Sequence, residues 1–162
     1  MEAQGRIWLD AEPAEVWSAM TDPEVLRGCV PGCKAVSREG PHDYRFHLEG
    51  KWGVIRASFQ VQVVIHDIEP AQATAPTSYS LSAQGEGPLG LAKGRSRIEL
   101  APKATGTDLL YAADGMADEK LGKLGRPVLR RAADHLSKKF FNRFADAVAA
   151  RDRMAESTNG RR

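Results

Sequence analysis

The stretch that decides the fold runs from Asp118 to Arg153 and reads DEKLGKLGRPVLRRAADHLSKKFFNRFADAVAARDR. Apolar residues recur in it at steps of three and four, at Leu121, Leu124, Val128, Ala132, Leu136, Phe140, Phe144 and Val148. This spacing predicts a long α-helix with one apolar stripe. Because Pro127 lacks a backbone N–H and its ring clashes with the preceding turn, we expect a kink or a fresh helix start near Gly125–Pro127.

The residues before this helix predict strands, apart from two short helices near the N-terminus. Residues 3–10 form a first strand, and helix starts follow at Pro13 and Pro23, each with acidic residues in its first turn. Apolar and polar residues then alternate along residues 33–39, 43–50, 55–65, 78–84, 91–101 and 107–116. Short turns between successive strands favour antiparallel pairing. The sequence thus predicts an α+β fold, with a curved antiparallel sheet of about six to seven strands around the long C-terminal helix.

Length and composition indicate one soluble domain. The 162 residues are 42 % hydrophobic and 27 % charged, which is ordinary for a globular protein. We expect a single domain over residues 1–154 and a polar tail over residues 155–162. No run reaches the ~18 apolar residues of a membrane span, and the N-terminus lacks the features of a secretory signal. The sequence therefore predicts a cytoplasmic protein.

Charge is distributed unevenly along the chain. Residues 1–119 hold 11 Lys and Arg against 17 Asp and Glu, whereas residues 120–162 hold 12 against 4. A basic helix on an acidic body can face anionic lipid or an acidic partner, or it can simply be solvated. Nucleic acid is not favoured, because no recognition motif accompanies the basic residues. The candidate membrane or partner surface consists of Arg126, Arg130, Arg131, Lys138, Lys139 and Arg143.

Several short motifs are spread over residues 1–150. They are Pro13-Ala14-Glu15-Val16-Trp17, Asp22-Pro23-Glu24-Val25-Leu26, Cys29-Val30-Pro31-Gly32-Cys33, Gly85-Glu86-Gly87 with Gly90 and Gly94, Thr107-x-Leu109-x-Tyr111, and a Gly122–Gly125 entry to a helix that carries Lys139-Phe140-Phe141. With this order of elements, the chain resembles the START-like, helix-grip proteins related to the birch-pollen allergen. Within them it is similar to the CoxG family of carbon monoxide dehydrogenase.

The resemblance implies a START-like (SRPBCC) domain that serves as an accessory to molybdenum-containing CO-dehydrogenase-type hydroxylases. It implies no catalytic residues, no cofactor, and an apolar cavity for a lipophilic ligand such as a quinone or another lipid. Such proteins are associated with bringing the enzyme to the inner face of the cell membrane. Longer family members have a C-terminal extension thought to anchor them. Attachment here either rests on the basic helix or the loops, or is absent.

We expect the cavity to lie between the sheet and the long helix. Small inward residues such as Ala57 enlarge it, and Tyr79, Tyr111 and Ser96 are the expected polar contacts for a quinone or carbonyl oxygen. These faces depend on strand phase, because a shift of one residue exchanges them. The predicted lining is Trp17, Leu26, Phe46, Ala57, Phe59, Val61, Tyr79, Leu81, Ser96, Tyr111, Leu124, Val128, Leu136 and Phe140.

Other kinds of site are less well supported. Gly85–Gly90 matches G-x-G-x-x-G, but a strand pattern follows it, so a glycine-rich hairpin is favoured over a nucleotide site. Cys29 and Cys33 lack the further ligands that a structural zinc needs, and we expect unpaired thiols. The alternatives to a binding module are a cyclase or hydrolase of the same superfamily, and an assembly scaffold that acts through the basic helix.

Overall fold

The computed structural model describes residues 1–52 and 54–159 of the chain. Its elements are β1 (Glu2–Leu9), α1 (Pro13–Met20), α2 (Pro23–Cys29), β2 (Cys33–Gly40), β3 (Asp43–Trp52), β4 (Ile55–Glu69), β5 (Ser78–Gly87), β6 (Gly90–Lys103), β7 (Gly106–Ala117), α3 (Glu119–Gly122) and α4 (Arg126–Asn159). The order of elements predicted from the sequence is confirmed. Asp22 is the N-cap of α2, since its carboxylate accepts a hydrogen bond from the Glu24 N–H at 3.0 Å.

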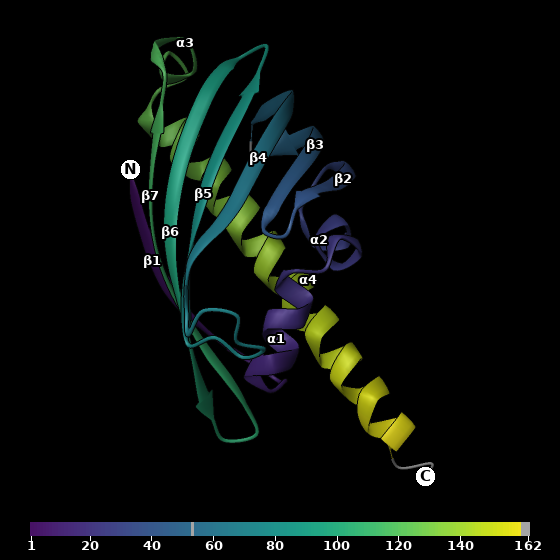
Figure 1. Cartoon of the computed structure of the whole chain (residues 1–162). Coiled ribbons are helices and arrows are strands. Elements are labelled where there is room, and N and C mark those ends of the chain that lie inside the picture. The colour runs from purple at the N-terminus through teal and green to yellow at the C-terminus, as the bar shows by residue number, and fades with distance from the viewer. Residues whose placement is uncertain (53, 160–162) are drawn as a thin grey trace.

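The seven strands form one antiparallel sheet in the order β1-β7-β6-β5-β4-β3-β2. Strands β2 to β7 each pair with their neighbour in sequence, and only the β1–β7 pair joins distant parts of the chain. Figure 1 shows the sheet curving around α4, which crosses it obliquely from the end that carries α3. The structure is therefore the predicted helix-grip arrangement, with α1 and α2 packed beside α4 on the concave face.

The register confirms the predicted strand faces. Directly paired residues lie on the same face of a sheet, and Tyr79 pairs with Ile98, which in turn pairs with Tyr111. Phe46 likewise pairs with Val61. All five side chains therefore point toward the helices, and the alternate positions, including the arginines of β6, point to the outer face.

The C-terminal region differs from the single helix expected from Asp118 onward. It forms two helices, and the predicted fresh start is confirmed at Arg126, after Gly125 with φ +90°. This left-handed conformation suits glycine and ends α3, so Leu124 lies between the helices. Asp118 caps α3 by accepting a hydrogen bond from the Leu121 N–H at 2.8 Å. α4 continues to Asn159, into the segment predicted as a polar tail, and residues 160–162 lie outside the described residues.

The core is densest where the C-terminal half of α4 meets the sheet. Phe144 and Val148 are 0 % and 1 % exposed, and the Phe144 ring stacks on Phe140 with centroids 5.6 Å apart. Arg151 fixes the same part of α4 to the N-terminal helices through an ion pair with Asp22 at 3.4 Å. The remaining buried apolar members of this cluster include Leu9, Val16, Tyr44, Ile65, Tyr79, Ile98, Leu100 and Leu109.

The substitution Phe144→Ala should therefore lower the free energy of unfolding by about 3–5 kcal/mol, because it removes a fully buried ring and leaves a cavity. Urea denaturation followed by circular dichroism measures the change. Lys138→Ala on the exposed side of α4 is the control, expected to stay within about 0.5 kcal/mol of wild type. Equal effects of the two substitutions would contradict this description of the core.

Candidate functional site

The residues predicted to line a cavity all lie on the helices, on the Leu124 linker, or on the sheet face that points toward the helices. Three of them, Leu26, Phe46 and Tyr79, are buried in the packed core. The others are only half-buried, and we call them the inner-face set: Trp17, Ala57, Phe59, Val61, Leu81, Ser96, Tyr111, Leu124, Val128, Leu136 and Phe140. Because they point inward and still contact solvent, α4 does not seal them off.

Burial of the inner face changes along the strands. On β5, Tyr79 is fully buried, whereas Leu81, two residues further on the same face, is half-buried. On β6 the neighbouring residues repeat the change, from buried Ile98 to half-buried Ser96. The concave face is therefore closed at the end that holds α1 and accessible toward the β5–β6 hairpin.

Tyr79 places a hydroxyl group at the closed end. Its side chain is 0 % exposed, and its ring lies edge-on to Trp17 with centroids 4.9 Å apart. Within the described residues this hydroxyl has no hydrogen-bond partner. Burial raises the pKa of the phenol well above its usual value, so the group stays neutral and available as a donor.

His42 is a neighbouring polar group that sequence reasoning missed. It lies in the turn between β2 and β3, and its ring centroid is 6.3 Å from that of Trp17. Its Nδ1 is also buried without a hydrogen-bond partner among the described residues. Two unpaired polar atoms therefore belong to rings that neighbour one indole, an arrangement that no local sequence signal indicates.

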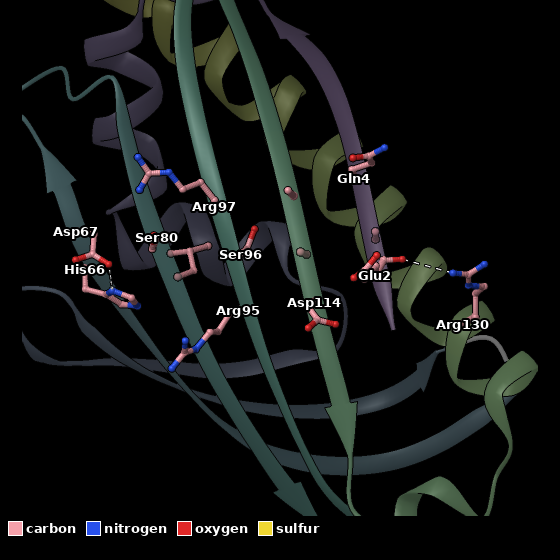
Figure 2. A pocket seen from close by; sticks show the side chains of 14 residues that line it. Glu2, Gln4, His66, Asp67, Ser80, Arg95, Ser96, Arg97, Asp114 and Arg130 are labelled. Atoms are coloured by element: carbon pink, nitrogen blue, oxygen red, sulfur yellow. Dashed lines mark hydrogen bonds and ion pairs between the residues drawn. The ribbon is translucent and has the colours of Figure 1, made fainter.

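The outer face of the sheet has a hollow of about 700 Å³. Figure 2 shows Arg95 and Arg97 on β6 within it, His66 and Asp67 on one side, and Glu2, Asp114 and Arg130 on the other. The sequence predicts the outward direction of both β6 arginines, but the hollow itself depends on the curvature of the sheet.

The side chains of the hollow are polar and several already have partners. Arg97 donates a hydrogen bond to the Ser78 hydroxyl at 2.9 Å, and His66 contacts Asp67 at 2.9 Å and the Ser82 hydroxyl at 2.7 Å. Such a lining suits small polar groups rather than a lipophilic molecule. The predicted cavity between sheet and helix is a separate matter, and it stays a prediction.

The predicted basic surface of α4 is exposed. Positions four apart lie next to each other on a helix, so Arg126, Arg130 and Lys138 share one row and Arg131, Lys139 and Arg143 the adjacent row. All six side chains point away from the core and are solvent-exposed. The ion pairs of the described residues include none of them. This part of the helix is an available cationic surface.

The remaining motifs have structural roles. Gly87 pairs with Gly90 across the β5–β6 turn, which confirms the glycine-rich hairpin. Cys29 and Cys33 are free thiols, and burial raises the pKa of both. In the described part of the chain, no three His, Cys, Asp or Glu side chains are close enough together to hold a metal ion. None of the described helices combines the length and apolar character needed to cross a membrane.

Comparison with known sequences identifies one family. The family model described as the CoxG subunit of carbon monoxide dehydrogenase matches residues 5–149. The comparison with curated proteins found no match.

Solved structures show the same fold. A conserved protein from Geobacillus kaustophilus is 26 % identical, with a TM-score of 0.82 over 93 % of this chain and 96 % of its own. A START superfamily protein from Mycobacterium smegmatis is 15 % identical, with a TM-score of 0.63 over 95 % of this chain and 98 % of its own. The ZhuI aromatase/cyclase from Streptomyces sp. R1128 is 14 % identical, with a TM-score of 0.67 over 93 % and 94 % of the two chains. At these identities the last two comparisons show the fold alone.

A matched pair of substitutions tests the state of the Tyr79 hydroxyl. Tyr44→Phe removes a hydroxyl that donates to the Thr21 carbonyl at 2.9 Å, so it should lower the free energy of unfolding by about 0.5–1.5 kcal/mol. Tyr79→Phe removes an unpaired hydroxyl and should leave that free energy unchanged or raise it by up to about 1 kcal/mol. Urea denaturation of the ligand-free protein distinguishes them, and a loss in Tyr79→Phe as large as that in Tyr44→Phe would show a missing partner.

Proposed function

Since this chain belongs to the CoxG family of carbon monoxide dehydrogenase, we propose that it is a non-catalytic accessory protein that binds a lipophilic molecule between its sheet and α4. In this proposal it also couples a molybdenum-containing CO-dehydrogenase-type hydroxylase to the cytoplasmic membrane. The protein then works in the cytoplasm, at the inner face of that membrane.

The inner-face set is the observation that supports this proposal most. Its members are almost all apolar, they face α4, and solvent still reaches them. Apolar side chains in contact with water gain free energy when an apolar ligand covers them, at roughly 25 cal/mol per Å². A flat ring or an isoprenoid chain supplies such a surface.

Tyr79 and His42 supply the polar contacts. The Tyr79 hydroxyl lies buried at the closed end, neutral and without a partner among the described residues, so it is free to donate to a carbonyl oxygen. A quinone has carbonyl oxygens on an otherwise apolar ring, which matches one buried donor among apolar side chains. We therefore propose a quinone or a similar carbonyl-bearing lipid as the ligand.

The polar groups of the inner face favour binding over catalysis. The predicted polar contacts are Tyr79, Ser96 and Tyr111, and none of these side chains is a general acid or base near neutral pH. The six exposed cations of α4 form the proposed surface for an acidic partner, either the hydroxylase or the membrane.

Native mass spectrometry of freshly purified protein, combined with organic extraction, tests ligand binding directly. A bound mass that extracts as a quinone or another lipid is the expected result. A clean ligand-free mass that persists after incubation with decylubiquinone would contradict the ligand and favour a scaffold that acts through α4.

Filling the proposed site should abolish retention of the ligand. Val128 faces the sheet from α4 and is half-buried, so Val128→Trp places an indole where the ligand is proposed to lie. We expect its affinity for decylubiquinone to fall by about tenfold or more, with stability changed by less than about 1 kcal/mol. Arg131→Trp on the exposed side of the same helix is the control. Tyr79→Phe should weaken binding by about three- to tenfold, the range expected for one hydrogen bond.

Reversing the charge of the α4 surface tests its role. Arg130→Glu, Arg131→Glu, Lys138→Glu and Lys139→Glu together should abolish co-purification of the hydroxylase. Because these side chains are exposed, thermal unfolding should stay close to that of wild type. Unchanged co-purification would show that the enzyme contacts another surface.

A further inference from the structure

Four segments distant in the sequence meet at one end of the molecule. They are the β3–β4 connection, the β5–β6 hairpin, the last residues of β7, and α3, and Figure 1 shows them together at the end from which α4 starts. Local contacts agree: the Asp118 N–H donates to the Leu91 carbonyl at 2.8 Å, and Gly87 lies against Ser58 and Phe59 of β4. We call residues 51–52, 54–56, 86–93 and 116–126 the hairpin end.

Two large apolar side chains project from the hairpin end into solvent. Val54, between β3 and β4, is 66 % exposed, and Met116, near the end of β7, is 71 % exposed. A single exposed apolar residue is ordinary on a protein surface. Here both lie at the tips of strands, and both lie at the end where the inner-face set is accessible.

Exposed cations accompany both apolar residues. Lys51 and Arg56 are directly opposite each other on β3 and β4, on either side of Val54 in the sequence. Like charges at directly opposite positions of a sheet repel each other and lower stability. Met116 is paired with a third exposed cation, Lys93. The ion pairs of the described residues include none of these three cations, so an anionic surface against the strand tips would offset the repulsion between Lys51 and Arg56.

The rest of the charge distribution gives this end a direction. Lys120, Lys123 and Arg126 add exposed cations at α3 and the start of α4. Acidic residues are present too, but Asp118 is the cap of α3 and its carboxylate accepts backbone hydrogen bonds. The opposite end, around the starts of α1 and α2, exposes the acidic residues Asp10, Glu12 and Glu24. An anionic plane therefore attracts the hairpin end and repels the other end.

From this combination we propose that the hairpin end docks on an anionic lipid membrane, with Val54 and Met116 inserted at the headgroup boundary and Lys51, Arg56 and Lys93 against the phosphates. Short apolar tips flanked by cations are the composition that binds such an interface. The inference rests on the proposed function, because a lipophilic ligand resides in the membrane. In this orientation it moves between the bilayer and the inner face without crossing water.

The test is flotation of the full chain with vesicles of phosphatidylcholine and phosphatidylglycerol, with vesicles of phosphatidylcholine alone as the reference. Wild type should bind the mixed vesicles at low salt and lose binding as salt rises. Val54→Asp with Met116→Asp should reduce vesicle binding by about tenfold or more, because it replaces both apolar contacts by charges that the anionic surface repels. Met154→Asp is the matched control, since Met154 is also 71 % exposed but lies near the far end of α4.

A second pair of substitutions protects the test against misfolding of the first. Lys51→Gln with Arg56→Gln should weaken vesicle binding and its dependence on salt, while thermal stability stays equal or rises because the opposed charges are gone. A purely structural role for these cations predicts the reverse, a loss of stability with vesicle binding unchanged.

Several results would overturn the docking proposal. They are no binding of wild type to mixed vesicles, equal binding by wild type and the Val54 and Met116 variant, or an equal loss in Met154→Asp. Binding that needs a protein partner rather than lipid would assign this end to that partner instead.

Retention of decylubiquinone in detergent solution separates the docking proposal from the function itself. A protein that retains the quinone but docks through another surface loses only the docking inference. One that docks through the hairpin end but retains no lipophilic molecule loses only the proposed ligand.

Discussion

The packing of Phe144 and Val148 against the closed end of the sheet is the interaction on which the rest of the structure depends. A seven-stranded sheet has a larger apolar face than one helix can cover, and here the covering is completed by α1 and α2 at one end only. Arg151 joins α4 to those helices at the same end. The other half of the concave face therefore stays accessible, which lets a well-packed core and a binding face share one sheet.

The polar atoms follow from this division. At the closed end, Tyr44 satisfies its hydroxyl on a backbone carbonyl, whereas Tyr79, also fully buried, has no such partner among the described residues. An unpaired buried hydroxyl costs stability, so its presence beside an accessible apolar face is informative about ligands as well as packing. The two tyrosines have the same chemistry and differ in whether the protein itself supplies a partner.

Charge adds a direction to the molecule. Cations gather on the exposed rows of α4 and at the hairpin end, while the starts of α1 and α2 are acidic. The α4 surface and the hairpin end extend over different parts of the molecule, so one molecule has room for an enzyme contact and a lipid contact at the same time. The hollow around Arg95 and Arg97 is a third feature, polar and on the opposite face of the sheet from α4.

The sequence by itself determined the periodic features of this protein. Alternation along β3 to β7 settled which side chains point inward, the 3–4 spacing settled the helix, and Pro127 with Gly125 marked the break before α4, because these signals depend on neighbours only a few residues away. Tertiary structure alone decided that Leu26, Phe46 and Tyr79 are buried while Leu81 and Ser96 are half-buried, although all five point inward. It also brought His42 beside Trp17 and gathered Val54 and Met116 at one end. Those outcomes depend on where α4 rests on a curved sheet, and the position of one element on another is set by packing across the whole chain rather than by any local pattern.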